Sequence, residues 1–410
     1  MRGVCPCLYI DYKQWVWRFF LNRNNELCYG IMYTNGKWTK DNLIDVNIID
    51  FNLFIDGNEG IHLIYSNTKG ELKYCTLKKK QWFGKVLYKI EDESYGIESI
   101  KVEMLGREMH IFFILASKIG NQHGVLMHCI LDDNKISFNK LQDIILEDEV
   151  KEHYLIKIKD NKEIYLFYLS DMGDEISLNY SIYKINKWGD FSRLYGINGE
   201  YICFDVEIDG SKIHILNRYK ENSLYTLDYI MIDYLGVYKY YNIYNSNIHI
   251  KDPFIFKESN NICVCWIEDN KIQYSKFNNI KWDKPLKFIN ENNDCLERYN
   301  TYISNIKKGT IDKCKLYGTT GLDLYLYYPK YFTVKENKNE KCNSEVKEYI
   351  NEIKLLQNEI DILNKKISSL MEENKRIKTE LEVEKQSVME RLLRRGKGGL
   401  WIKILIIYLT

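Results

Sequence analysis

A unit that recurs six times is the feature that most constrains how this 410-residue chain folds. Each copy starts with a short apolar run, passes a polar turn to a triplet of the type Leu-x-Tyr, and ends after a second turn in an aromatic residue. These closing aromatics are Trp38, Trp82, Phe138, Trp188, Tyr238 and Trp282. Neighbouring copies are therefore 44 to 56 residues apart, which is the range of a four-stranded propeller blade.

The composition of the unit predicts four β-strands. A strand candidate precedes each apolar run, as at residues 46–53, and another follows the aromatic, as at 86–90. These segments are rich in Ile, Tyr, Val and Phe and are bounded by Asn, Asp, Gly and Lys. No long helical period occurs before residue 344. We therefore predict an all-β propeller over residues 1–334.

The faces of the predicted strands also favour a propeller. In residues 61–65, alternation places Ile61, Leu63 and Tyr65 on one face and His62 and Ile64 on the other. Both faces are largely apolar, so each sheet needs a neighbouring sheet on both sides, which radial stacking supplies. The closing Trp is then expected to pack between successive blades.

The number of blades has two readings. Six units are legible, and a seventh is predicted from strand candidates at residues 299–306, 314–319, 322–328 and 331–334. Alternatively, this tail completes the first blade and locks the ring. Of six and seven four-stranded blades, we favour seven.

The unit resembles the blades of sialidase-like and fucose-lectin-like propellers, which share the apolar strand, the turn, Leu-x-Tyr and then Trp. The resemblance covers roughly residues 8–334, and it implies the propeller fold and a binding function. The sialidase Asp box, Ser-x-Asp-x-Gly-x-x-Trp, is missing, and so are the double glycines of Kelch blades. Trp282-Asp283 is a single Trp-Asp dipeptide and does not establish WD40 repeats.

Composition narrows the cellular setting and the partners. The formal net charge of +1 gives no overall attraction to nucleic acid, so we expect no nucleic-acid partner. The 11 cysteines are an odd number and form no Cys-x-x-Cys pair. Residues 1–7 contain no apolar run of signal-peptide length. We therefore expect a reducing, cytoplasmic location.

A heptad repeat follows a polar linker at residues 335–343 and predicts a coiled coil over residues 344–393. β-Branched residues at the first core position with Leu at the second favour a parallel dimer, and Asn374 would fix its register. The seam fails at Glu384 and Arg391. The alternative is one amphipathic helix packed on the propeller. The predicted dimer contacts are Ile353, Leu356, Ile360, Leu363, Ile367, Leu370, Asn374, Ile377 and Leu381.

The last residues, 394–410, combine cations with an apolar run. Arg394, Arg395 and Lys397 precede Trp401 and the apolar stretch around it, which is too short to span a bilayer. Such a tail is typical of a segment that docks on an anionic membrane surface, here the inner face of a membrane. A buried end and a disordered end are the alternatives.

Catalytic and metal motifs are scarce. His62, His110 and His214 recur at equivalent positions of different units, so we interpret them as packing residues rather than as a metal site. An acidic turn at Asp171, Asp174 and Glu175 is interpreted as a solvated hairpin tip. No phosphate-binding glycine loop, His-Glu-x-x-His or Gly-x-Ser-x-Gly motif is present. We predict no cofactor, metal or catalytic residue.

Two hypotheses about function follow. The first, which we favour, is a non-enzymatic binding protein whose propeller head takes a glycan or protein ligand and is multimerised by the coil. The second is a propeller enzyme that acts on glycans. The missing Asp boxes and the absent secretion signal weigh against the enzyme, but the fold alone does not decide.

Overall fold

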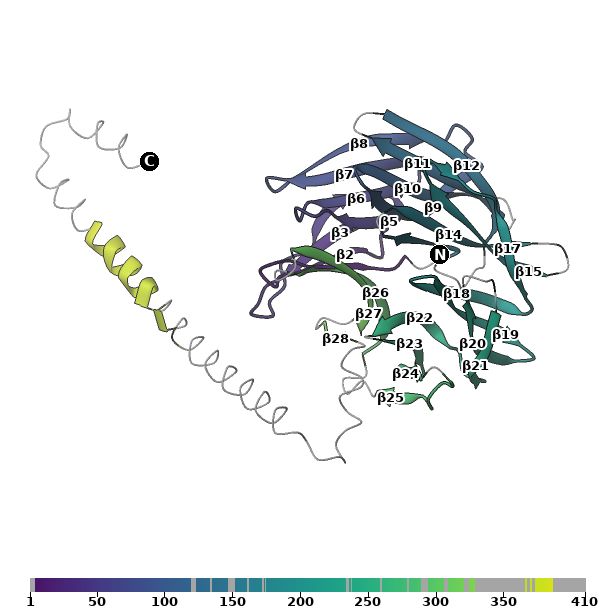
Figure 1. Cartoon of the computed structure of the whole chain (residues 1–410). Coiled ribbons are helices and arrows are strands. Elements are labelled where there is room, and N and C mark those ends of the chain that lie inside the picture. The colour runs from purple at the N-terminus through teal and green to yellow at the C-terminus, as the bar shows by residue number, and fades with distance from the viewer. Residues whose placement is uncertain are drawn as a thin grey trace, which may run out of the picture. The chain divides into compact units, whose positions relative to one another are not determined.

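The computed structural model describes residues 4–328 and 366, 369–370 and 373–385. Short gaps in the first range are residues 119–122, 133–134, 147–151, 161, 172, 174, 234–235, 237, 259, 279, 289–293, 306–308 and 321–323. The chain divides into two compact units, Met1–Thr333 and Val334–Thr410. In the first unit, all the regular structure among the described residues is β-strand, as predicted (Figure 1).

Five of the sheets are antiparallel and consist of consecutive strands. The first of them holds β5 (Ile48–Ile55), β6 (Ile61–Asn67), β7 (Glu71–Lys78) and β8 (Gln81–Lys89). The next holds β9 (Tyr95–Leu105), β10 (Glu108–Ser117), β11 (His123–Asp132) and β12 (Lys135–Ile145). A five-stranded sheet holds β13 (Tyr154–Lys159), β14 (Glu163–Asp171), β15 (Ile176–Lys184), β16 (Lys187–Trp188) and β17 (Ser192–Ile197). The fourth holds β18 (Glu200–Asp209), β19 (Lys212–Glu221), β20 (Leu224–Ile232) and β21 (Tyr238–Ser246). The fifth holds β22 (Lys251–Glu258), β23 (Asn261–Glu268), β24 (Lys271–Phe277) and β25 (Leu286–Phe288).

The sixth sheet joins the two ends of the propeller sequence. It holds β1 (Cys7–Ile10), β2 (Val16–Leu21), β3 (Leu27–Met32) and β4 (Asn42–Asp45) together with β26 (Leu296–Asn305), β27 (Thr310–Thr319) and β28 (Leu326–Tyr327). Strand β26 pairs in parallel with β1, and Figure 1 shows green β26 beside the purple strands. The described strands therefore form six hydrogen-bonded sheets, and the pairing of β26 with β1 locks the ring. Strands β26–β28 nevertheless pack as a layer of their own, because Tyr317 lies in a cluster with Phe254 of β22, whereas Tyr299 lies in a cluster with Leu8 and Val16 of the first blade. Their packing on two neighbours is that of the seventh blade that we favoured, and strand candidate 331–334 lies outside the described residues.

The first strands of successive sheets form the inner wall of a ring. Contacts run from β1 to β5, β9, β13, β18 and β22 in turn. The ring closes at Tyr317 of β27, whose hydroxyl donates to the carbonyl of Asp252 over 2.8 Å. Its aromatic ring also lies 5.0 Å from that of Phe254 in β22. The arrangement is the radial stacking of blades that the repeat predicted.

Apolar residues on both faces of a blade bury themselves against its two neighbours. Ile61 and Leu63 of β6 pack in one cluster with Phe19 of the first blade. Ile64, which points the other way, packs in a different cluster with Val102 and Ile111 of the third blade. The predicted alternation is therefore confirmed, and it explains why each blade needs two partners.

The closing aromatic of a unit packs on the preceding blade, and in three cases it meets the last residue of that blade's Leu-x-Tyr triplet. Trp82 lies edge-on to Tyr29, with ring centroids 5.8 Å apart. Trp282 lies edge-on to Tyr229 at 5.0 Å. In the third case the triplet ends in His128 instead of tyrosine, and Trp188 lies edge-on to this histidine, with ring centroids 5.6 Å apart. The two positions that recur in the sequence unit are thus the two sides of one contact between blades.

Buried carboxylates tie successive first strands together. Asp50 of β5 accepts hydrogen bonds from its neighbour Phe51 over 2.8 Å and from the N–H of Ile100 in β9 over 2.7 Å. Asp205 of β18 likewise accepts a hydrogen bond from the N–H of Ile255 in β22 over 3.0 Å. Both bridges span 50 residues, so the period of the repeat reappears in the contacts that join the blades.

The predicted coiled-coil region is described only in its C-terminal part, where residues 366, 369–370 and 373–385 are helical (yellow in Figure 1). The apolar side chains that the heptad assigns to the seam are about half exposed in the single chain: Leu370 is 49% exposed, Ile377 49% and Leu381 50%. The helix is therefore present at these residues, while the dimer remains a prediction. The linker, the rest of the predicted coil, including Ile353, Leu356, Ile360, Leu363 and Ile367, and the tail with Arg394, Arg395, Lys397 and Trp401 lie outside the described residues.

Two general features complete the description. The ten cysteines among the described residues all carry free thiols. Among these same residues, no helix combines the length and apolar character that crossing a membrane requires.

Candidate functional site

Two cavities lie along the inner wall of the ring. The first, of about 760 Å³, is lined mainly by residues at the starts of the first strands, such as Asp50, Ser99 and Tyr299. The second, of about 670 Å³, is lined by later parts of these strands, such as Ile158 and Glu207, and by β27. Both volumes fall in the range of about 300–1,000 Å³ typical of small-molecule sites.

Four polar residues line both cavities and therefore stand between them. They are Asn52 of β5, Lys101 of β9, Glu152 just before β13, and Asn300 of β26. They come from four different units of the repeat, so only ring closure brings them together. We call these four residues the junction.

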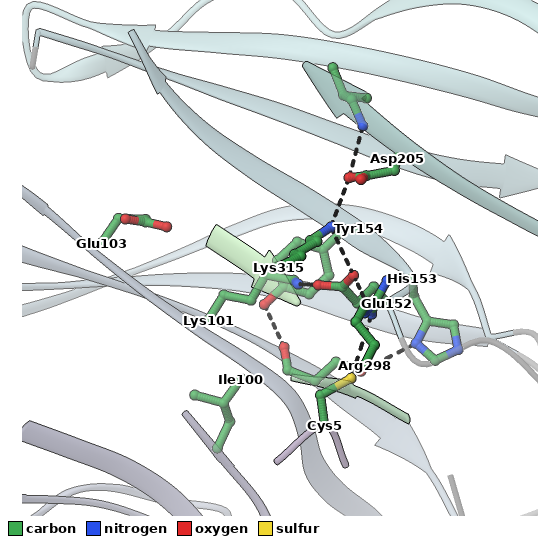
Figure 2. A network of polar contacts seen from close by, with 12 residues as sticks. Cys5, Ile100, Lys101, Glu103, Glu152, His153, Tyr154, Asp205, Arg298 and Lys315 are labelled. Atoms are coloured by element: carbon green, nitrogen blue, oxygen red, sulfur yellow. Dashed lines mark hydrogen bonds and ion pairs between the residues drawn. The ribbon is translucent and has the colours of Figure 1, made fainter. Parts of the chain in front are cut away.

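The carboxylate of Glu152 is the centre of a network of ion pairs, shown in Figure 2. Its Oε1 accepts a hydrogen bond from Lys101 Nζ over 2.6 Å, and its Oε2 accepts one from Arg298 Nη2 over 2.7 Å. The Nζ of Lys315 lies 3.4 Å from Oε2 and 2.8 Å from Asp205 Oδ1. The carboxylate of Glu152 thus connects the third blade to the C-terminal strands, and Lys315 extends the network to Asp205 of the fifth blade.

The network fixes the charges of its members. Burial opposes ionisation of Glu152, but Arg298, Lys101 and Lys315 together hold the pKa of its carboxyl well below the usual range. Burial likewise opposes the charges of Arg298 and Lys315. Glu152 nevertheless raises the pKa of Arg298, and Asp205 together with Glu152 raises the pKa of Lys315. All three groups therefore stay charged near neutral pH, and none is a ready proton donor or acceptor.

Asp50 lines the first cavity in a different electrostatic state. Burial raises the pKa of its carboxyl to about 7, although the backbone N–H groups of Ile100 and Phe51 partly oppose the shift. Both of its oxygens are engaged by these N–H groups. The first cavity therefore contains one carboxylate held ionised and one that titrates near neutrality.

A serine and a histidine also meet in the first cavity. Ser99 Oγ lies 3.2 Å from Nδ1 of His153, which is buried. Ser99 has a φ of 55°, but Tyr201 and Asp252 near the starts of two other first strands share this conformation. The left-handed backbone is therefore a recurrent feature of the blade rather than a special feature of Ser99.

The second cavity is ringed by pairs of opposite charge. Lys157 Nζ contacts Glu207 Oε2 over 3.2 Å, which joins the fourth and fifth blades. Lys313 of β27 pairs with Glu103 of β9 across the ring. Each lysine here has an acidic partner, so the cavity wall is rich in charge but balanced.

The amide side chains of Asn52 and Asn300 differ from the charged residues of the junction, which are paired with each other. Both residues are half-buried. Within the described part of the chain, neither side chain has a hydrogen-bonding partner. An amide that lines a cavity and has no internal partner still offers a donor and an acceptor to a ligand.

The candidate residues from the sequence lie elsewhere. His62, His110 and His214 are in three different sheets, where each hydrogen-bonds within its own blade: His62 Nδ1 to Tyr74, His110 Nδ1 to His128 and His214 Nδ1 to Tyr229. No group of three possible metal ligands occurs among the described residues.

The acidic turn is also separate from the cavities. Asp171 is exposed and Glu175 pairs with Arg193, while Asp174 is outside the described residues. The junction and Arg298 were missed by the sequence reasoning. The one sequence signal that pointed to them is a lysine followed by an acid about one blade later, as in Lys101 and Glu152.

Comparison with known proteins gives structural similarity only: neither a family model nor a curated protein matches the sequence. An ulvan lyase of polysaccharide lyase family PL25 is 11% identical with a TM-score of 0.48, covering 66% of this chain and 78% of that chain. The fucose-specific lectin from Aleuria aurantia is 10% identical with a TM-score of 0.43, covering 68% and 93%. An α-L-arabinanase from Penicillium chrysogenum is 7% identical with a TM-score of 0.43, covering 68% and 92%. The similar structures thus include a lectin of the kind that the repeat resembles.

Proposed function

We propose that this protein is a non-catalytic recognition protein whose propeller binds a glycan at the central cavities and whose C-terminal helix multimerises it. The observation that carries the proposal is the state of the junction. Its ionisable groups, Glu152 and Lys101, are paired with each other. The amide side chains of Asn52 and Asn300, by contrast, have no hydrogen-bonding partner among the described residues. Such a site can hold a ligand by hydrogen bonds but has no free acid or base to transform it.

Glu152 illustrates why catalysis is disfavoured. A general acid needs a pKa raised towards the working pH, and the pKa of Glu152 is held low by three cations. Its oxygens also already accept hydrogen bonds from Lys101 and Arg298. Using Glu152 as a nucleophile or base would break the ion pairs that join the blades.

The second candidate is a glycan-active enzyme, and one observation favours it. Asp50, with a pKa of about 7, and Glu152, held ionised, line the same cavity. Carboxyls whose pKa values are pushed apart are typical of glycosidase acid and base pairs. However, both oxygens of Asp50 accept hydrogen bonds from backbone N–H groups, which hold the carboxyl in one orientation and favour its ionised form.

A combined binding and turnover assay tests the proposal. The full chain is applied to a glycan array, and every bound glycan is then incubated with protein and analysed for cleavage by chromatography. We expect binding without new reducing ends and without unsaturated products. Cleavage that is lost in Asp50→Asn would establish the enzyme instead.

We further propose that the coiled coil displays two propellers together and that the basic and apolar tail holds the pair at the inner face of a membrane. The support for the coil is the heptad seam, whose described members Leu370, Ile377 and Leu381 are about half exposed in one chain. The support for the tail is its sequence, with cations beside Trp401. Two heads on one coil would raise avidity for a repeated ligand.

A further inference from the structure

We infer that the ligand is a neutral saccharide unit and that the amides of Asn52 and Asn300 bind it at the junction. This inference rests on the proposed recognition function and adds the class of ligand and the residues that select it. Its basis is the difference between polar groups in the cavities that are already satisfied and those that are not.

The charges around the junction are balanced inside the protein, although Arg298 Nε is buried without a hydrogen-bonding partner among the described residues. Lys101 and Arg298 donate to Glu152, and Lys315 contacts both Glu152 and Asp205. An acidic ligand that competed for these cations would leave the carboxylate of Glu152 buried without its partners, which is strongly unfavourable. The junction is therefore poorly suited to a carboxylated or sulfated sugar.

The neutral groups are not satisfied in this way. The side chains of Asn52 and Asn300 have no hydrogen-bonding partner among the residues that the structure describes. An amide offers two donors on nitrogen and an acceptor on oxygen, so one asparagine can bind a hydroxyl that donates and another that accepts. Paired hydroxyls of this kind are the defining groups of a sugar.

The position of the two amides fits a ligand that enters a cavity. The residues lie on β5 and β26, and Tyr302, two positions after Asn300, donates a hydrogen bond to the carbonyl of Leu53, next to Asn52. This 2.7 Å bond fixes the two strands against each other. The amides are thereby held on a rigid wall, and a sugar that binds them needs no rearrangement of the backbone.

The experiment measures the binding of neutral and acidic saccharides to the full chain by titration calorimetry. The probes are glucose, galactose, fucose and mannose, and oligomers of each, beside glucuronate and sulfated galactose. The same titrations are made with Asn52→Ala, Asn300→Ala and the matched control Asn58→Ala, an exposed asparagine in the turn after β5. Thermal unfolding of each variant shows whether it folds, and Asn52→Ser replaces Asn52→Ala if that variant does not.

We expect at least one neutral sugar to bind the parent and the control equally, and to bind each junction variant about ten-fold more weakly, the loss expected for one unpaired hydrogen-bonding group. Neutral binding that survives in both junction variants would overturn the assignment of the site while leaving the recognition function intact. Binding of acidic sugars alone would overturn the ligand class. Cleavage of the sugar, or no saccharide binding at all, would instead contradict the proposed function.

Discussion

Arg298 and Glu152 are 146 residues apart in the chain, yet Arg298 Nη2 donates a 2.7 Å hydrogen bond to Glu152 Oε2 inside the ring. The side chains of both residues are largely buried, at 6% and 13% exposure. This pair joins the C-terminal strands to the start of the fourth blade, so it acts across the ring rather than between neighbours. Buried ion pairs are costly to form and more costly to break from one side.

The first prediction is that Glu152→Gln strongly destabilises the propeller. Glutamine keeps the shape of the side chain but removes the charge that balances Lys101 and Arg298. Leaving buried cations without a partner costs about 3–5 kcal/mol. Urea unfolding followed by tryptophan fluorescence measures the loss.

Asp209→Asn is the matched control for this measurement. Asp209 also bridges two blades through Lys257, but it is 40% exposed, and exposed pairs contribute about 0–1 kcal/mol. A Glu152→Gln protein as stable as the Asp209→Asn protein would show that the central network does not hold the ring together.

The second prediction concerns the aromatic contact that the repeat places between blades. Trp82→Ala removes the edge-on contacts with Tyr29 and Phe19 of the first blade. Because Trp82 is half-buried, we expect a loss of about 3 kcal/mol, the lower end of the range for large aromatics. Phe83→Ala, which removes an exposed aromatic next to it, should leave the unfolding free energy nearly unchanged. Equal melting of the two variants would contradict a packing role for Trp82.

These contacts were predictable because they follow from a short, repeated pattern. The positions of Trp82 and Tyr29 within their units are visible in the sequence, and period-2 alternation gives the face of each strand. The same reasoning gave both faces of β6 correctly. What it left open was how the C-terminal strands join the first blade, because the parallel pairing of β26 with β1 leaves no local signal.

The candidate site was harder to predict than the fold for a physical reason. Asn52, Lys101, Glu152 and Asn300 belong to four units, and they meet only when the ring closes. Asn52 and Lys101 occupy equivalent positions of the repeat, opposite Ile64 and Phe112, but the residue type at this position differs between units. Their side chains are polar residues in strands that are otherwise apolar, which is also true of many solvent-facing positions. Only the spacing of about 50 residues between Lys101 and Glu152, or Lys157 and Glu207, connects them to the blade period.

The third prediction concerns pH and a buried histidine pair. Trp188 Nε1 donates to His128 Nδ1 over 3.2 Å, so His128 carries its proton on Nε2 and donates to His110 Nδ1 over 2.9 Å. Burial lowers the pKa of His110 to about 4 and that of His128 to about 3, the latter helped by His110. Both rings are therefore neutral in the folded protein at neutral pH.

The sign of the pH effect follows from these pKa values. Unfolded histidines bind protons below about pH 6.5, whereas the folded pair does not bind them until about pH 4 and 3. Above pH 6.5 the two histidines therefore do not lower the free energy of unfolding. As the pH falls below that value, each histidine lowers the free energy of unfolding by up to about 1.4 kcal/mol per pH unit. Unfolding free energies measured between pH 7 and 4 should fall less steeply in His128→Phe than in the parent. Parallel slopes would show that the pair does not titrate on unfolding.

The fourth prediction is that the full chain is a dimer. Two parallel helices would bury Leu370, Ile377 and Leu381, which are about half exposed in one chain, and pair Asn374 with its copy. Light scattering should give twice the chain mass for residues 1–410 and a monomer for a chain that ends at residue 340. Asn374→Ile should raise the melting temperature of the coil and broaden its oligomeric state towards trimers. A monomeric full chain would rule out the coiled coil.

The last prediction concerns the tail. Arg394, Arg395 and Lys397 precede Trp401 and an apolar run, and each cation near an anionic surface contributes about 1 kcal/mol of binding free energy. Two tails on one dimer would act together, so the full chain should co-sediment with vesicles that contain phosphatidylserine and stay in solution with purely neutral lipid. A chain that ends at Glu390 keeps the described helix and should not sediment with either vesicle. Because the attraction is largely electrostatic, binding should weaken as salt is raised from 50 to 500 mM. Equal sedimentation of both chains would place any membrane contact outside the tail, and no sedimentation of the full chain at low salt would refute the anchor.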